Sequence, residues 1–302
     1  MRSCEKGHAI LITGAPKSGS TWIGRMVALE PSIGYIHEPF NLSHDLGACR
    51  ARFNYWFSYV CAENEQQYIA DFERTFHFQY NLIERLKSTR SAHLRKTLKM
   101  YVQFLQHRLL NHRPLVKDPL AIFSAEWLAN TFDMDVVVII RHPAAFVASY
   151  KVENWTHAFD HFLKQPLLMR DKLNPYKSEI EDFTAHQYDI VDQATLLWRL
   201  IYGTVLNYQQ DHREWIFVRH EDISLEAISE FTQLYGKLNL TMSKHIVDII
   251  RQHSSSKNNA DLKRNSVANI TTWKSRLTTE ELARIKEKVS DISAAFYAED
   301  EW

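Results

Sequence analysis

The alternation of apolar and polar segments along the chain predicts an α/β protein. Short apolar runs of the length of buried strands occur at 8–14, 33–40, 114–120, 134–143 and 214–222. The run MDVVVIIRHP at 134–143 has five consecutive β-branched residues, which is typical of a strand covered on both faces in a parallel sheet. Because helical segments separate these runs, we expect three layers, with a central, mostly parallel sheet of about five strands and helices on both faces.

Two longer segments between the strands interrupt this regular alternation. Residues 43–111 show helical periodicity in FNYWFSYV, YIADFERTFHFQYNLIERL and LRKTLKMYVQFLQHRLL, and no Gly/Pro-rich linker delimits them. We interpret 43–111 as a helical insertion within a single domain that spans 1–302. The polar and aromatic stretch 155–185 is interpreted as an irregular lid or acceptor-side insertion. At the C-terminal end, Thr278 or Thr279 followed by Glu281 predicts the start of the final helix.

Composition limits the partners that the chain is expected to have. The 302 residues include 36 basic and 36 acidic side chains, so the net charge is zero and favours neither nucleic acid nor an anionic membrane as the main partner. No apolar run approaches the roughly 18 residues of a membrane-spanning helix. The N-terminus runs directly into a strand pattern, and the three cysteines form neither a CxxC pair nor a disulfide framework. We therefore expect a cytoplasmic protein, although a chain trimmed of an N-terminal anchor has the same pattern.

The stretch TGAPKSGSTWIG (13–24) indicates a loop that binds phosphate. Gly14 and Gly19 keep the spacing of the GxxxxGK[ST] motif, but Ser20 stands at the position of its lysine. The loop's lysine, Lys17, lies two residues before the second glycine. Backbone N–H groups of such a loop and the N-terminus of the following helix form an anion site. An ordinary Gly/Ser turn is the alternative.

The stretch RHPAAFVASY (141–150) indicates a second anion site. In nucleotide triphosphatases a strand of this kind ends in an aspartate that holds magnesium, whereas this strand ends in Arg141. An arginine repels a metal and receives an anion bidentately. Ser149 follows two helical turns later, within reach of the same anion; a salt bridge of Arg141 at the strand end is the alternative. Two anion sites without a recognisable magnesium carboxylate favour a metal-free donor with a phosphate at each end of one nucleoside.

These two motifs resemble a known family. PKSGSTW resembles the 5′-phosphosulfate loop of the sulfotransferases that use 3′-phosphoadenosine 5′-phosphosulfate (PAPS), and IIRHPAAFVASY resembles their 3′-phosphate segment. The resemblance follows the order of elements from about residue 9 to 290 and implies a P-loop NTPase-like fold. It implies that the 5′ end of the donor contacts Pro16, Lys17, Ser18, Gly19, Ser20, Thr21 and Trp22, and that its 3′-phosphate contacts Arg141 and Ser149. Trp22 is also suited to stack on adenine.

The same resemblance gives Lys17 and the segment YIHEPFN (35–41) a catalytic role. Lys17 stabilises the negative charge on the departing bridging oxygen, and a general base takes the proton of the acceptor hydroxyl. Glu38 and His37 are the candidate bases. Branches that act on sugars resemble this chain in placing a glutamate here, whereas branches that act on phenols and steroids carry a histidine in a KTH-like motif.

The stretch after the third strand decides between these branches. It reads Lys117-Asp118-Pro119 and contains no histidine, which favours Glu38 as the base. Strand alternation points His37 away from Glu38, and a purely structural pairing of either side chain is the alternative. Lys117 either assists the leaving oxygen or pairs with Asp118.

A late segment, KRNSVANITTWKSRL (263–277), resembles the basic, GxW-like element that closes over the nucleotide in the family. Arg264 and the pair Trp273–Lys274 fit this element, but its glycines are absent. We expect Arg264 to contact the donor.

Together these motifs predict a PAPS-dependent sulfotransferase that produces 3′,5′-bisphosphoadenosine. It would transfer the sulfuryl group in line, without a metal, to a hydroxyl of a small-molecule or glycan acceptor, and the position of Glu38 favours a saccharide or glycoconjugate. The alternatives are a P-loop small-molecule kinase, which would need ATP and magnesium, and a nucleotide-binding protein without catalytic activity.

Overall fold

The computed structural model describes residues 7–88, 94–255 and 270–302. Within these residues five strands form a parallel sheet with the order β2-β3-β1-β4-β5. The predicted α/β class is confirmed: four strands fall within the predicted apolar runs, and β3 begins one residue before its run. The strands are β1 (Ala9–Gly14), β2 (Ile33–His37), β3 (Arg113–Lys117), β4 (Met134–Ile140) and β5 (Ile216–Arg219).

Helices connect the strands. The longer ones are α1 (Ser20–Val27), α2 (Ile69–Phe76), α3 (Leu82–Ser88), α4 (Leu94–Leu109), α5 (Ala125–Phe132), α6 (Pro143–Glu153), α9 (Lys177–Ala185), α10 (Ile190–Asp211), α12 (Ala227–Lys237), α13 (Lys244–Ser255) and α15 (Thr279–Ser293). Shorter helices are α7 (Asp160–Leu163), α8 (Pro166–Leu168) and α11 (His220–Leu225). No helix in the described parts of the chain combines the length and hydrophobicity that crossing a membrane requires.

The chain divides into two compact units. The first unit comprises Met1–Thr13 and Ile23–Val136, and the second comprises Gly14–Trp22 and Val137–Trp302. The chain thus leaves the first unit for nine residues, which lie within the predicted phosphate-loop stretch 13–24, and returns to it along α1. The single domain over 1–302 stays a prediction.

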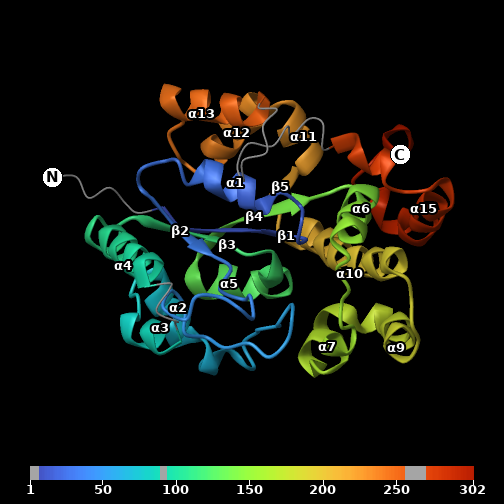
Figure 1. Cartoon of the computed structure of the whole chain (residues 1–302), viewed down its shortest axis with the longest axis horizontal. Coiled ribbons are helices and arrows are strands. Elements are labelled where there is room, and N and C mark those ends of the chain that lie inside the picture. Colours follow the sequence, from blue (N-terminus) through green and yellow to red (C-terminus); the bar gives the residue numbers. More distant parts are fainter. Residues whose placement is uncertain (1–6, 89–93, 256–269) are drawn as a thin grey trace. The chain divides into compact units, whose positions relative to one another are not determined.

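In the first unit, strands β2, β3 and β1 pair in parallel through a mostly apolar interior. Ile36 and Leu11 are both in register with Val116, and all three side chains are buried. On one face, α1 approaches so closely at Gly24 that a Cβ there would lie 3.1 Å from Lys117 Cγ. Helix α5 lies on the other side of these strands (Figure 1).

The predicted helical insertion is correct only in part. Residues 94–109 form α4, which matches the helix predicted over 94–110, but the segment FNYWFSYV (53–60) is irregular and the prediction of a helix there is wrong. The aromatic side chains of this segment pack on rings from other segments and do not line one helical face. Phe53, for example, stacks on Phe40 at 4.4 Å and on Tyr68 at 5.1 Å between ring centroids. The predicted helix over 68–86 is divided into α2 and α3, because Phe78 has a left-handed backbone with φ 52°.

In the second unit, β4 and β5 pair in parallel, with Val138 in register with Phe217. Helices α12 and α13 lie on one side of these two strands and α10 lies on the other (Figure 1). Helix α10 packs against both α6 and α15. The predicted start of α15 is confirmed: the Thr278 hydroxyl accepts from the Glu281 N–H at 3.1 Å, and the Glu281 carboxylate accepts from the Thr278 N–H at 2.8 Å.

The expectation that residues 155–185 are irregular is wrong, because most of this stretch forms the short helices α7 and α8, a π turn and α9. Proline stands in the first turn of two of its helical segments, at Pro166 and Pro175, where its missing N–H costs nothing. The aromatic side chains Phe159 and Phe183 pack together across the stretch, with ring centroids 5.4 Å apart. Helices this short show little periodicity in sequence. The role of a lid stays a prediction.

Candidate active site

The loop Gly14–Gly19 of the second unit requires both of its glycines. Gly14 has φ 138°, and a Cβ there would lie 2.4 Å from the carbonyl oxygen of Ile139. Gly19 has φ 89°, and a Cβ there would lie 2.4 Å from Nδ1 of His220. Only glycine avoids both the strained backbone and the collision. The spacing that suggested a phosphate loop therefore reflects the path that the backbone takes between β1 and α1.

Lys17 is held by partners that the sequence did not indicate. Its Nζ lies 3.1 Å from Glu153 Oε1 and 4.2 Å from the centroid of the Trp155 ring. Its backbone is left-handed, with φ 63°, a conformation that costs a non-glycine residue about 1–3 kcal/mol and is often found at functional sites. Glu153 follows Ser149 by four residues on α6, so the two side chains share one face of the helix, but this spacing does not indicate a contact with Lys17.

Ser18 presents a hydroxyl that lacks a partner. Its side chain is fully buried, and Oγ makes no hydrogen bond within the described residues. Leaving such a group unsatisfied costs about 1–3 kcal/mol. The first-turn N–H groups of α1, which begins at Ser20, have no acceptor within the helix either. These donors suit an anion seated in the loop.

The other predicted residues of the loop surround these donors. Pro16 and Thr21 are half-buried, and Ser20 is buried. The Trp22 ring packs edge-on against Phe231, with centroids 5.3 Å apart. The stacking of Trp22 on adenine stays a prediction.

Arg141 is brought to the loop, whereas Ser149 is engaged on its own helix. The Arg141 guanidinium donates through Nη1 to the carbonyl oxygen of Lys17. Its backbone is fixed by α10, because its N–H donates to Tyr202 Oη at 3.0 Å and its carbonyl accepts from Trp198 Nε1 at 2.9 Å. Ser149 Oγ donates to the Ala145 carbonyl at 2.9 Å. Arg141 therefore connects the two predicted anion motifs within the second unit.

The late tryptophan of the sequence motif packs on His142, the residue that follows Arg141. The Trp273 ring stacks on His142 at 5.3 Å between centroids and an angle of 10°. His142 caps α6 by accepting from the Ala144 N–H at 3.2 Å, and burial lowers its pKa to about 4. Arg264 lies outside the described residues, so its predicted contact stays a prediction.

In the first unit, Glu38 is an ionised carboxylate clamped by a buried lysine. Lys117 Nζ contacts Glu38 Oε1, Asn41 Nδ2 donates to Oε2 at 2.8 Å, and the Glu38 N–H donates to the Lys117 carbonyl at 2.9 Å. Burial acts to raise the pKa of Glu38, but the charge of Lys117 and the hydrogen bonds from Lys117 and Asn41 outweigh it and lower that pKa. The Glu38 side chain is 18% exposed, and its role as a base stays a prediction.

His37 lies nearer to Glu38 than strand alternation predicted. Its Nε2 is 4.0 Å from Glu38 Oε1, and its Nδ1 is 3.3 Å from Tyr35 Oη. Alternation fails because Glu38 has φ 43°, which turns its side chain out of the strand pattern. Burial, and next the charge of Lys117, lower the pKa of His37, so the ring is neutral at neutral pH.

Lys117 does not pair with Asp118, which was one of its two predicted roles. The Asp118 carboxylate accepts instead from the N–H groups of Phe40 at 2.6 Å and Leu120 at 2.9 Å. Burial raises the pKa of Asp118 to about 7. Lys117 therefore pairs with Glu38. That Lys117 assists the leaving oxygen stays a prediction.

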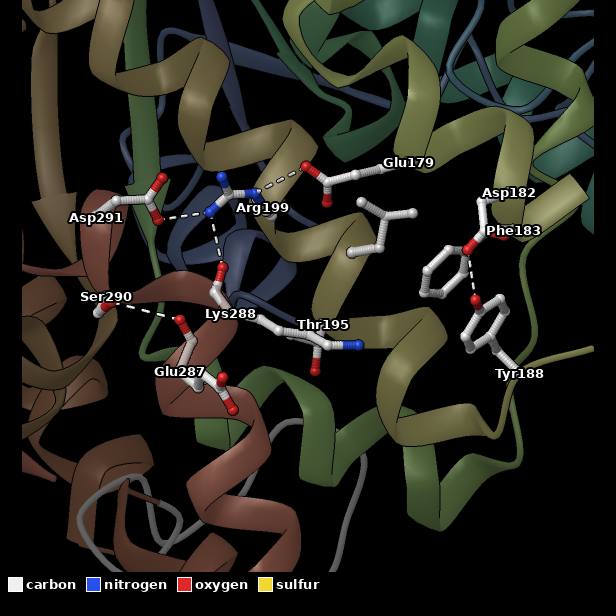
Figure 2. A pocket seen from close by; sticks show the side chains of 11 residues that line it. Glu179, Asp182, Phe183, Tyr188, Thr195, Arg199, Glu287, Lys288, Ser290 and Asp291 are labelled. Atoms are coloured by element: carbon white, nitrogen blue, oxygen red, sulfur yellow. Dashed lines mark hydrogen bonds and ion pairs between the residues drawn. The ribbon is translucent and has the colours of Figure 1, made fainter.

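A separate pocket of about 540 Å³ lies in the second unit. Figure 2 shows Phe183 beside Tyr188, with rings stacked 3.9 Å apart, and Arg199 directed at Glu179 and Asp291. None of the predicted site residues lines it. The pocket is lined by Glu179, Asp182, Phe183, Tyr188, Thr195, Leu196, Arg199, Glu287, Lys288, Ser290 and Asp291. In the described parts of the chain no group of three or more His, Cys, Asp or Glu side chains could hold a metal ion.

Several solved structures are similar to the chain. The chain is similar to solved structures of the sulfotransferase domain from the curacin biosynthetic pathway, with 15% identity and a TM-score of 0.49 over 94% of this chain and 98% of that one. It is also similar to mouse sulfotransferase SULT7A1 complexed with PAP, with 11% identity and a TM-score of 0.48 over 95% and 85% of the two chains. Sulfotransferase STF9 from Mycobacterium avium has 12% identity and a TM-score of 0.46 over 98% and 78%.

The sequence of the chain matches a protein family but no individual curated protein. No curated protein matches the chain. The model of the sulfotransferase family, in contrast, matches residues 9–244, which is well over half of the chain and includes the loop, Glu38, Lys117, Arg141 and Ser149. The chain therefore belongs to the sulfotransferase family and is an enzyme that transfers sulfuryl groups.

Proposed function

We propose that this sulfotransferase uses PAPS as its donor and transfers the sulfuryl group in line, without a metal, to a hydroxyl of a saccharide or glycoconjugate. The observation that carries this proposal is the Glu38–Lys117 pair. A carboxylate that stays ionised, is partly exposed and lies at the end of β2 is suited to remove the proton of an attacking hydroxyl.

The second unit offers groups that fit both ends of the proposed donor. The buried Ser18 hydroxyl and the N–H groups at the start of α1 suit the 5′-phosphosulfate. The guanidinium of Arg141, with the Ser149 hydroxyl, suits the 3′-phosphate. Lys17 exchanges Glu153 for the bridging oxygen of the donor when the donor binds.

The proposed step balances as follows. The acceptor oxygen forms a bond to sulfur, and its proton passes to Glu38. The bond between sulfur and the bridging oxygen breaks, and its electron pair stays on the 5′-phosphate of 3′,5′-bisphosphoadenosine. Lys17 stabilises the charge that develops on that oxygen. Lys117 keeps Glu38 deprotonated before the attack, and His37 remains the alternative base.

The acceptor class rests on the groups around Glu38. Asn41 and the neutral ring of His37 both lie beside this carboxylate, and such groups hydrogen-bond readily to hydroxyls. A glutamate in this position is also the feature by which the chain resembles the branches that act on sugars. A saccharide hydroxyl is therefore the proposed acceptor.

Calorimetry tests the donor. In EDTA we expect 3′,5′-bisphosphoadenosine to bind and ATP to bind more weakly. Arg141→Ala should weaken binding of the bisphosphate while leaving that of adenosine 5′-phosphate nearly unchanged, because the two ligands differ only in the 3′-phosphate. ATP binding that requires magnesium, together with no binding of the bisphosphate, would favour the kinase and exclude the proposal.

Glu38→Gln tests the base. The glutamine keeps the size of the side chain but cannot accept the proton, so turnover should fall about 100-fold or more. Affinity for the bisphosphate should stay unchanged. His37→Gln serves as the matched control and should retain most of the turnover. The reverse result would assign the base to His37, and unchanged turnover in both variants would remove both candidates.

A further inference from the structure

Helix α4 exposes an apolar stripe that is separate from the face that it buries. The buried face includes Thr97 and Phe104, and the Phe104 ring packs against Phe78 at 5.7 Å between centroids. At about 100° per residue, the exposed apolar side chains fall within an arc of about 80°, whose centre lies about 110° around the helix from Thr97 and Phe104. They are Leu94, Leu98, Val102, Leu105 and Leu109, with exposed fractions of 45%, 46%, 49%, 38% and 74%.

The stripe continues onto neighbouring residues. Leu110, directly after α4, is 67% exposed, and α3, which packs against α4, adds Ile83 at 69% and Leu86 at 42%. We call these eight side chains the α3–α4 face. Most of the large exposed hydrophobic side chains of the described residues belong to it. Contiguous exposed apolar patches of this kind mark surfaces that bind a protein or a membrane.

All of the Lys, Arg, Asp and Glu side chains on α4 are basic. The helix has four Lys and Arg side chains and no Asp or Glu, although the whole chain is neutral. All four are exposed, and within the described residues none of them forms an ion pair. The helical repeat places Arg95 and Lys99 along one edge of the apolar stripe and Arg108 along the other. An apolar stripe with cations at both edges is the pattern of a helix that lies in a membrane interface.

This charge pattern distinguishes between possible occupants. Two copies of the chain that met through α4 would bring four cations against four cations, which repel. An anionic surface instead neutralises these cations while the apolar stripe leaves water. We propose that the α3–α4 face docks on membranes that contain anionic lipids, with the stripe at the acyl boundary and Arg95, Lys99 and Arg108 at the headgroups.

Docking would place the proposed base near the membrane. Helix α4 packs against β2, the strand that ends immediately before Glu38, and a Cβ at Gly34 of β2 would lie 3.1 Å from the His107 ring of α4. The charge of Lys96 on α4 also reaches His37 and helps to lower its pKa. The acceptor of the docked enzyme is then a hydroxyl carried by a lipid headgroup. This last step rests on the proposed function, whereas docking itself does not.

Co-sedimentation of the full chain with vesicles tests the docking. The chain should bind vesicles of phosphatidylcholine with phosphatidylserine, and should bind phosphatidylcholine alone much more weakly. Val102→Gln/Leu109→Gln should weaken binding to anionic vesicles at least about tenfold, because two side chains no longer leave water. The matched control Val152→Gln/Leu225→Gln changes one valine and one leucine that are 59% and 56% exposed in the second unit, and should bind like the unsubstituted chain.

Three outcomes would overturn the docking proposal. They are no binding to anionic vesicles, equal binding to both kinds of vesicle, and equal loss in the control variant. The face would instead be assigned to a second copy of the chain if the chain binds no vesicles, forms a dimer in sedimentation velocity, and loses that dimer in Val102→Gln/Leu109→Gln.

Glu38→Gln separates docking from catalysis, because it should sediment with anionic vesicles like the unsubstituted chain even when it transfers no sulfuryl group. If the unsubstituted chain docks but a glycolipid acceptor in the same vesicles reacts no faster than in detergent, the assignment of the acceptor is wrong and docking stands.

Discussion

The two side chains proposed to move charge in the reaction, Lys17 and Glu38, share a local design. Each is a non-glycine residue with a left-handed backbone, with φ 63° and 43°. Each contacts one side chain of opposite charge: Lys17 contacts Glu153, and Glu38 contacts Lys117. The pairs differ in exposure, since Glu153 is 49% exposed and Lys117 is fully buried. The first pair is therefore easily exchanged for a ligand, whereas the second is a fixed part of the site.

Glu153→Gln should strengthen donor binding. The substitution removes the carboxylate that competes with the donor for Lys17. Exposed pairs contribute about 0.2–1 kcal/mol, so affinity for 3′,5′-bisphosphoadenosine should rise by up to about fivefold. Calorimetry at low and high salt checks this, and the gain should shrink as salt screens the pair. Weaker binding in the variant would mean that Glu153 positions Lys17 for the donor.

Lys117→Met should shift the acid limb of the pH profile to higher pH. Glu38 acts as a base only when deprotonated, so kcat/KM falls as the pH drops through its pKa. That pKa is now below the ordinary value because Lys117 outweighs burial. Without the lysine, burial is opposed only by the Asn41 hydrogen bond and the interaction with His37, so the pKa of Glu38 rises. Asn41→Ala removes a single neutral hydrogen bond and should move the limb in the same direction by less. An unmoved limb in Lys117→Met would exclude Glu38 as the titrating base.

At the scale of elements, the exits of β2 and β3 are joined by Asp118. Its carboxylate holds the N–H of Phe40, beyond β2, and that of Leu120, beyond β3, while its carbonyl accepts from the Thr13 hydroxyl of β1 at 2.8 Å. A single buried side chain thus fixes the ends of strands that are distant in sequence. This arrangement sets the direction of the segment that carries Glu38.

Asp118→Asn should destabilise the protein by about 1–3 kcal/mol. The asparagine oxygen satisfies one of the two N–H groups, but its own NH₂ group then faces the other, leaving a buried donor without an acceptor. Urea unfolding measures the loss. Thr13→Val removes one hydroxyl donor to the same residue and should cost less. Equal stability of Asp118→Asn and the unsubstituted protein would contradict this account.

The elements also show which features sequence reasoning can reach. The strands were predictable because apolar runs such as Val136–Ile140 have few other uses, and the glycines of the loop because no other residue fits their backbone. The segment 53–60 was not predictable, since Phe53 packs on rings that are distant in sequence. The same holds for the Lys17–Glu153–Trp155 contacts and the Glu38–Lys117 clamp, which depend on how separate segments pack. A periodic pattern reports one face of one element and contains no information about its partners.

At the scale of the whole molecule, a net charge of zero conceals a strongly uneven distribution. The positive charges of α4, which has no acidic residue, are balanced in the total by acidic residues elsewhere in the chain. The expectation from composition that the chain does not favour an anionic membrane therefore describes long-range attraction only. It does not apply to a surface on which apolar side chains and cations act together at short range.

The division into two units predicts that donor binding and proton transfer can be altered independently. The contacts described for Glu38 come from the first unit, and those described for Lys17 and Glu153 come from the second. Side chains without shared partners usually show additive effects, to within about 0.5 kcal/mol. The double variant Glu38→Gln/Glu153→Gln should therefore combine the lost turnover of the first change with the tighter bisphosphate binding of the second. Calorimetry and turnover on the four proteins of this cycle measure the coupling. A coupling energy well above about 0.5 kcal/mol would show that the carboxylate of Glu38 influences the loop even without an acceptor.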